Sequence, residues 1–323
     1  METTTYVESL KIIEFQLTTY FPIFRISFKP TIMKKLFCLS LLLLLSTAIF
    51  GQSAPPSTDI YVYSMKEKKG KISLSKEKNI TKRDGYDNQP SFFNNDYILY
   101  TSSQQDGQTD IMIYDLYEEE VKNLTNSKDS EYSPLPIPGF NSFAVVRVEA
   151  DNSQRLWMYH MDGKSEPQLI FDKIQPVGYF AISERDILMF VLGQPVTMVM
   201  ANMEEVDDDI ITSNIGRTIR LIPGTKDFTF ERREENGTTL IYRLNKSSKR
   251  FTKVVEKPKG ASDWTITGEG TYITSVGAKL LAFNPEHHNE WVEIMDSGQV
   301  GANGITRMAV SQENDKLAIV VNN

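Results

Sequence analysis

Histidines and clustered carboxylates are the side chains in this 323-residue chain that could support metal or acid–base chemistry. The histidines are His160, His287 and His288, and none stands at a metal-ligand spacing from a second ligand on one strand face. The acidic run at residues 204–209 could bind calcium, but it lacks the glycine and the alternating spacing of a dedicated calcium loop. We read this run as a solvated loop, and we expect neither a metal site nor a cofactor.

A repeated sequence unit offers few catalytic groups in the segments that open each copy. Ser133 lies 44 residues after Gln89, its counterpart in the preceding copy, and Val177 opens the next copy. These opening segments contain no histidine, and Asp263 is their only carboxylate. Acid–base catalysis usually needs two positioned groups. The sequence therefore favours a protein that is not an enzyme; the alternative is a lyase or hydrolase that acts on a glycan or lactone.

The same opening segments, with the loops before them, contain side chains suited to binding. Aromatic residues and arginines dominate the centres of protein interfaces. We expect these residues to surround a central mouth that engages a protein or peptide partner, although each Tyr or Trp could instead pack between sheets. The candidates are Tyr86, Asp87, Tyr132, Tyr179, Arg217, Arg220, Asp263, Trp264 and Arg307.

Short strands separated by polar turns must position these side chains. Residues 88–125 read as four such strands, each rich in β-branched or aromatic residues. The pattern gives five complete units, while residues 59–81 supply only third and fourth strands and residues 305–321 only first and second strands. A repeat of this length with four strands is typical of a β-propeller. We predict an all-β, six-bladed propeller over residues 59–323, with four-stranded antiparallel blades and a ring closed by pairing of the N-terminal and C-terminal strands.

The sequence of the second strand in several units is evidence that the blades pack face to face. Residues 144–146 and 317–321 are apolar at successive positions, so both faces of these strands are apolar. A sheet packed between two neighbours should show this pattern, whereas a sheet with one solvated face should alternate.

The repeat resembles the WD-like repeats of TolB-type propellers. The matching segments are Asn88-Gln-Pro-Ser-Phe, Tyr97-Ile-Leu-Tyr-Thr-Ser, Asp110-Ile-Met-Ile-Tyr-Asp-Leu and Asn123-Leu-Thr. The likeness is strongest over residues 59–171 and continues afterwards as spacing and strand pattern. It implies a periplasmic binding platform, here a propeller without the N-terminal α/β domain of TolB proper. A subunit of a larger secretion or surface-attachment assembly is a further possibility.

The N-terminal region looks like a secretory signal. Residues 33–51 contain two lysines followed by a 15-residue apolar run, shorter than the roughly 20 residues that span a membrane. We expect Met33 to be the true start, residues 1–32 to be a non-native upstream extension, and residues 52–58 to form a linker. Cys38, the only cysteine, lies within the signal, so the mature protein has no disulfide.

Charge and localisation limit the partners. The chain carries a net charge of −7, which disfavours nucleic acid. We therefore expect a monomeric periplasmic or secreted protein with no stable membrane span after signal cleavage, and a partner that is an envelope protein or peptide.

Overall fold

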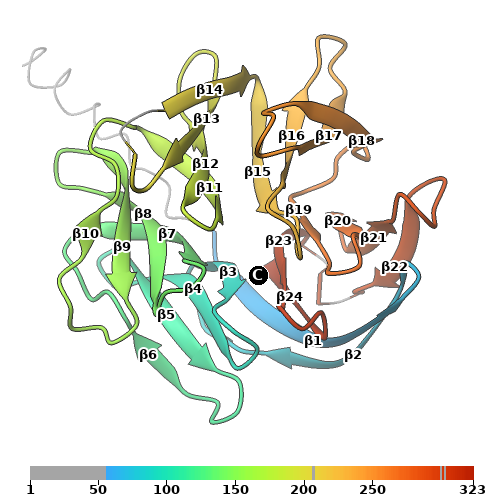
Figure 1. Cartoon of the computed structure of the whole chain (residues 1–323). Helices are drawn as coiled ribbons and strands as arrows, with labels where there is room; N and C mark the ends of the chain where they lie inside the picture. Colours follow the sequence, from blue (N-terminus) through green and yellow to red (C-terminus); the bar gives the residue numbers. More distant parts are fainter. Residues whose placement is uncertain (1–55, 206–207, 299, 302) are drawn as a thin grey trace, which may run out of the picture. The chain divides into compact units, whose positions relative to one another are not determined.

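The computed structural model describes residues 56–205, 208–298, 300–301 and 303–323. The predicted signal at residues 33–51 and the upstream residues 1–32 lie outside this part of the chain. Within the described ranges the chain forms strands and no helix, and the strands make six four-stranded antiparallel sheets (Figure 1). The predicted all-β, six-bladed propeller is therefore confirmed.

Three of the blades are consecutive meanders in the first part of the chain. Blade 1 consists of β3 (Asp87–Phe92), β4 (Tyr97–Ser103), β5 (Thr109–Asp115) and β6 (Val121–Asn123). Blade 2 consists of β7 (Ser130–Pro136), β8 (Ser142–Val148), β9 (Gln154–His160) and β10 (Gln168–Leu169). Blade 3 consists of β11 (Val177–Ser183), β12 (Asp186–Val191), β13 (Thr197–Asn202) and β14 (Asp208–Ser213).

Two further meanders precede the blade that closes the ring. Blade 4 consists of β15 (Ile215–Leu221), β16 (Phe228–Arg233), β17 (Thr239–Leu244) and β18 (Phe251–Glu256). Blade 5 consists of β19 (Trp264–Ile266), β20 (Tyr272–Val276), β21 (Lys279–Phe283) and β22 (Val292–Asp296). Blade 6 consists of β23 (Ile305–Val310), β24 (Lys316–Asn322), β1 (Thr58–Lys68) and β2 (Lys71–Asn79), in this order from the channel outwards.

Blade 6 joins the two ends of the described chain. β24 pairs antiparallel with β1, with Ile60 opposite Val320 and Val62 opposite Ala318, and it pairs with β23 on its other edge. The C-terminal half-unit and the N-terminal half-unit thus complete one sheet, as predicted. This pairing covers two strand edges that would otherwise be free to recruit other chains.

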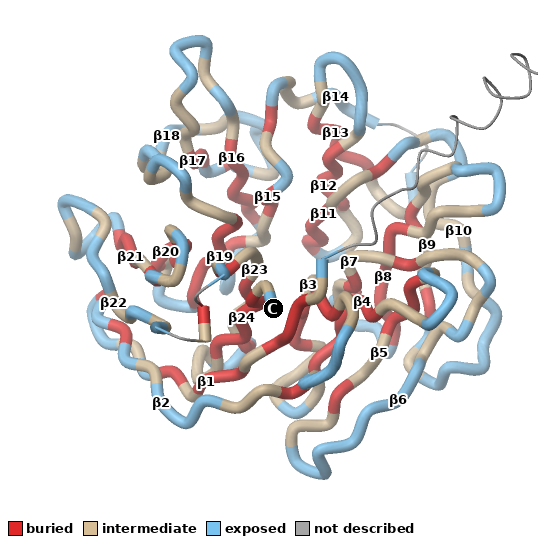
Figure 2. The backbone as a smooth tube through the Cα atoms, turned by 180° about the vertical axis from the view of Figure 1, so that it is seen from behind, coloured by how far each residue is buried: buried red, intermediate tan, exposed pale blue. Residues whose placement is uncertain are grey.

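Every pair of neighbouring blades encloses its own apolar cluster. In β24, Leu317 and Ile319 pack toward blade 5, whereas Ala318 and Val320 pack toward blade 1. The remaining clusters lie between blades 1 and 2, 2 and 3, 3 and 4, and 4 and 5. Both faces of the second strands are buried for this reason, and Figure 2 shows them as red segments inside paler outer strands. The predicted two-sided packing is confirmed.

The outermost strands differ in length, from two residues in β10 to nine residues in β2. A repeated Asp–Asn hydrogen bond explains why Asp and Asn recur in the repeat. Asn123 donates to Asp110 at 2.6 Å in blade 1, and Asn79 donates to Asp59 at 2.8 Å in blade 6. Each bond ties the end of the outermost strand to the strand beside it.

Candidate functional site

The first strand of every blade lines a central cavity of about 540 Å³. β3, β7, β11, β15, β19 and β23 surround the centre of the ring in Figure 1. Since each blade repeats the same antiparallel order from the channel outwards, these strands all start at one end of the channel, which we call the entry end. The loops that follow the first strands lie at the other end, which we call the loop end.

At the entry end, each blade places one polar or aromatic side chain either just before its first strand or at the third residue of that strand. Burial raises the pKa of Tyr86 to about 12, and the charges of Arg307 and Arg217 and the hydroxyls of Tyr179 and Tyr132 are close enough to modify that pKa. The structure thus brings together candidates that lie far apart in the sequence. The six positions, from blade 1 to blade 6, are Tyr86, Tyr132, Tyr179, Arg217, Asp263 and Arg307.

A chain of polar contacts crosses the channel at this end. Asp263 accepts a 2.6 Å hydrogen bond from Nε of Arg217 and a second bond from Nη1 of Arg307. Nη2 of Arg307 donates to the hydroxyl of Tyr179 at 3.0 Å. Blades 6 and 3 lie on opposite sides of the six-membered ring, so the bond between Arg307 and Tyr179 spans the channel. We refer to Arg217, Asp263, Arg307 and Tyr179 as the channel bridge.

Opposite charges hold the channel bridge in its ionised form. Asp263 is only 4% exposed. Burial alone raises the pKa of Asp263, but the charges of Arg307 and Arg217 outweigh burial and hold that pKa below its ordinary value. The carboxylate is thus already bound by two guanidinium groups, and it is the only carboxylate among the described residues that line the cavity.

Arg220 lines the cavity near the channel bridge but takes no part in it. Its Nη1 donates to the backbone oxygen of Ile219 at 3.0 Å, and within the described chain it makes no ion pair. Burial lowers the pKa of Arg220; the Asp263 carboxylate opposes this effect, and the like charges of Arg307 and Arg217 add to it. Three guanidinium groups and one carboxylate thus line the described part of the cavity.

The cavity wall becomes apolar toward the loop end. Ile219, Thr265 and Ala309 line it together with a set of prolines and loop residues. Several of the loop residues, including Pro138, are exposed to solvent, so the cavity opens at this end. The prolines and exposed loop residues are Pro90, Pro134, Pro136, Pro138, Gly139, Pro223 and Gln312. We did not single out these residues from the sequence, although the repeated Gln-Pro and Ser-Pro steps at the start of β3 and β7 marked them.

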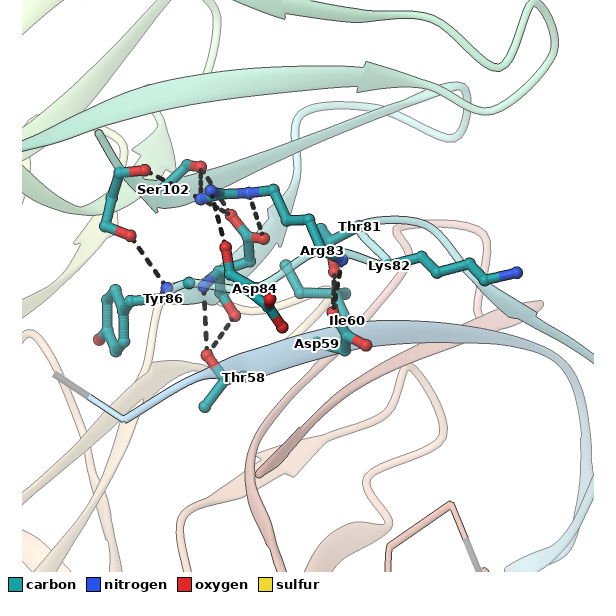
Figure 3. A network of polar contacts seen from close by, with 12 residues as sticks. Thr58, Asp59, Ile60, Thr81, Lys82, Arg83, Asp84, Tyr86 and Ser102 are labelled. Atoms are coloured by element: carbon teal, nitrogen blue, oxygen red, sulfur yellow. Dashed lines mark hydrogen bonds and ion pairs between the residues drawn. The ribbon is translucent and has the colours of Figure 1, made fainter. Parts of the chain in front are cut away.

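Asp87, another candidate, lies in a network between blades 6 and 1; Figure 3 labels its partners Thr58, Arg83 and Ser102. The Asp87 side chain is completely buried and accepts hydrogen bonds from Nη2 of Arg83 at 2.9 Å and from Oγ of Ser102 at 2.6 Å. Oγ1 of Thr58 donates to the backbone oxygen of Asp87 at 2.8 Å. Asp87 therefore anchors the N-terminal strand to blade 1 and does not offer a free group to a ligand.

Trp264 also lies away from the cavity. It is completely buried in the apolar cluster between blades 4 and 5, where its ring packs against Tyr272. Its Nε1 donates to Oε2 of Glu231 at 3.0 Å, and Glu231 also pairs with Lys257 at 2.7 Å. Trp264 is a core residue, because packing between blades and a buried acceptor satisfy both its ring and its N–H.

Comparison with known proteins identifies the fold. No protein-family model and no curated protein sequence matches the chain. The putative TolB from Agrobacterium tumefaciens superposes with a TM-score of 0.64 at 10% identity, over 83% of this chain and 99% of that one. An oligogalacturonate lyase in complex with manganese gives a TM-score of 0.54 at 11% identity, over 78% of this chain and 83% of that one. The fold is that of a TolB-like propeller.

A third match, TolB from Acinetobacter baumannii, has a TM-score of 0.49 at 18% identity and covers 62% of this chain and 51% of that one. At these identities the likeness concerns the fold, so the chemistry of this TolB-like propeller has to be read from its own residues. Across the described ranges, no group of three His, Cys, Asp or Glu side chains is placed to hold a metal ion. No described helix is long and apolar enough to cross a membrane.

Proposed function

We propose that this TolB-like propeller is a binding module of the bacterial envelope, periplasmic or secreted, that engages a protein or peptide partner in its axial channel. The observation that supports this function is the cavity itself, which combines apolar walls with arginine and tyrosine side chains at one end. Binding pockets commonly pair apolar walls with a few polar groups that orient the ligand. Asp263 is engaged by Arg217 and Arg307, which supports a binding role over acid–base catalysis.

Capture of a partner from a bacterial envelope extract tests this function. The full chain is immobilised as the wild type and as Ala309→Trp, which places a large ring on a residue that lines the cavity. Val121→Trp is the matched control, because Val121 lies on the outer strand β6 and is 45% exposed. We expect the wild type and Val121→Trp to capture the same protein and Ala309→Trp to lose it while it still unfolds cooperatively. Equal capture by all three variants would exclude the channel as the binding site.

A propeller lyase is the second candidate function, and the manganese-containing oligogalacturonate lyase of similar fold supports it. The likeness does not extend to sequence, since the two chains share 11% identity. Metal analysis of the purified protein separates the two functions. A stoichiometric divalent ion would favour the lyase if removing the ion also abolished cleavage of an oligogalacturonate substrate.

A further inference from the structure

The channel bridge lies across the entry end of the channel. The channel bridge links blades 4, 5, 6 and 3 through Arg217, Asp263, Arg307 and Tyr179. On the remaining side, Tyr86 lies just before β3 of blade 1 and Tyr132 lies within β7 of blade 2. The cavity continues from this polar layer to exposed residues at the loop end. A ligand that enters at the loop end therefore meets the channel bridge, which we call the floor of the cavity.

The floor carries an excess of positive charge. Arg217, Arg220 and Arg307 line the cavity, where Asp263 is the only carboxylate among the described lining residues, and it pairs with Arg217 and Arg307. The Asp263 carboxylate already bonds to Arg217 and Arg307, so this environment demonstrably accommodates a carboxylate. Within the described chain, Arg220 makes no ion pair and Arg217 uses only Nε for hydrogen bonds, which leaves donors on both residues for a ligand. Guanidinium groups bind carboxylates through strong, charge-assisted hydrogen bonds.

The channel bridge and the positive charge beside it together favour one end of a peptide. A chain terminus can end at the floor, whereas a segment from the middle of a chain would have to pass the channel bridge or turn back to the same opening. An amino terminus is positively charged and would be repelled by Arg220 and its neighbours, but a carboxyl terminus is attracted. The apolar wall formed by Ile219, Ala309 and the prolines suits the side chains of the last residues of such a peptide.

We propose that the channel binds the free C-terminal carboxylate of a partner polypeptide, which enters from the loop end and is held by Arg220 and Arg217. This inference rests on the proposed binding function and adds the part of the partner that is recognised. It also reverses the direction of approach that the sequence suggested, because the predicted mouth residues form the floor of the cavity.

The test uses fluorescein-labelled hexapeptides with four randomised C-terminal positions. One pool carries a free C-terminal carboxylate and the other a C-terminal amide. We expect the immobilised full chain to retain the acid pool at least tenfold more than the amide pool, because the carboxylate makes charge-assisted bonds that an amide cannot replace. Arg220→Gln should remove this difference, whereas Arg220→Lys should keep part of it. Arg250→Gln, at an exposed arginine of a hairpin turn, is the charge-matched control and should behave as the wild type.

Several results would overturn the proposal. They are equal retention of the two pools, no retention of either, or an acid-pool preference that survives in Arg220→Gln with an unchanged melting temperature. Displacement of the acid pool by an equal concentration of free galacturonate would assign the arginines to an acidic sugar instead. The proposed function has an independent readout. If Ala309→Trp blocks capture of a partner, and the wild type binds that partner equally well with an amidated C-terminus, the channel is a binding site that does not recognise the carboxylate.

Discussion

Nη2 of Arg307 in blade 6 donates a 3.0 Å hydrogen bond to the hydroxyl of Tyr179 in blade 3, on the opposite side of the ring. The guanidinium group also lies 5.2 Å from the centre of the Tyr179 ring. These two residues are 128 positions apart in the sequence. A single side-chain contact thus connects the two halves of the propeller through the channel, in addition to the contacts between neighbouring blades.

Removing the Tyr179 hydroxyl should weaken this connection. Tyr179→Phe keeps the ring beside Arg307 but loses the hydrogen bond, so we expect the free energy of unfolding to fall by about 1–2 kcal/mol. Urea denaturation measures the change. Tyr117→Phe is the control, because Tyr117 is 85% exposed and should change the stability by less than about 0.5 kcal/mol. If both variants unfold at the same urea concentration as the wild type, the bond across the channel does not stabilise the ring.

Asp263 should make stability depend on pH in the acidic range. Its pKa in the folded protein lies below the ordinary value, so the unfolded chain binds this proton more readily. The stabilisation by Asp263 is present above about pH 4, the ordinary pKa of an aspartate, and it is lost as the pH falls through the lower pKa of the folded state. Asp263→Asn should lower the free energy of unfolding at pH 6 by roughly 2–4 kcal/mol, because Arg307 loses its buried partner.

Urea denaturation at pH 6 and pH 3 checks both parts of this prediction. We expect the difference between wild type and Asp263→Asn to shrink at pH 3, which lies below the ordinary pKa of an aspartate, because the unfolded wild-type chain then binds this proton. Asp84→Asn is the control at an exposed aspartate and should track the wild type at both pH values. A difference that stays constant between pH 6 and pH 3 would show that the ionised carboxylate of Asp263 contributes nothing specific.

The ring and its closure could be predicted from the sequence, because both follow from repeat spacing and from complementary half-units at the two ends. Which side chains face the channel could be predicted only in part: Tyr179, Arg217, Arg220, Asp263 and Arg307 line the cavity, whereas Asp87 and Trp264 do not. The first strands contain irregularities in register, between Val177 and Tyr179 in β11 and between Ile305 and Arg307 in β23. Each irregularity inserts a residue and turns the following side chains to the other face, so simple alternation no longer gives the orientation.

The buried position of Trp264 shows a second reason why the site residues could not all be predicted from the sequence. Its N–H bonds to Glu231, which lies 33 residues earlier and in the neighbouring blade. No local pattern marks this pairing, and a tryptophan at the start of a first strand suits a binding site as well as a core. The excess of positive charge in the cavity could not be predicted either, since it depends on which arginines pair with the carboxylate of Asp263.

Glu131, which the sequence did not mark, should also make stability depend on pH. Its side chain is completely buried between blades 1 and 2; Oε1 accepts hydrogen bonds from Ser127 at 2.5 Å and Tyr159 at 3.0 Å. Burial raises the pKa of Glu131 to about 7, although hydrogen bonds from Ser127 and Tyr159 oppose this effect. Since the folded protein holds the proton more tightly than the unfolded chain, the stabilisation is complete below about pH 4.3 and is lost as the pH rises through 7.

Glu131→Gln tests this relationship. Glutamine keeps an oxygen for Ser127 and Tyr159 but has no proton to lose, so the variant should be more stable than the wild type at pH 8, by about 3 kcal/mol at most. Glu166→Gln, at an exposed glutamate, should leave the pH dependence unchanged. Parallel curves of unfolding free energy against pH for the wild type and Glu131→Gln between pH 5 and pH 8 would contradict the assignment.

Ring closure depends most directly on β24. Leu317, Ile319 and Val321 lie in the cluster shared with blade 5, and Ala318 and Val320 in the cluster shared with blade 1. Burial of each large apolar side chain contributes about 1.5–3 kcal/mol, and a typical domain has only about 5–15 kcal/mol of net stability. Deleting residues 317–323 should therefore give an unfolded or aggregating protein.

Deleting Asn323 alone removes only its hydrogen bonds to Ser57 and should cost less than about 1 kcal/mol. A cooperative thermal melt of the longer deletion close to that of the full chain would show that the ring does not need this strand.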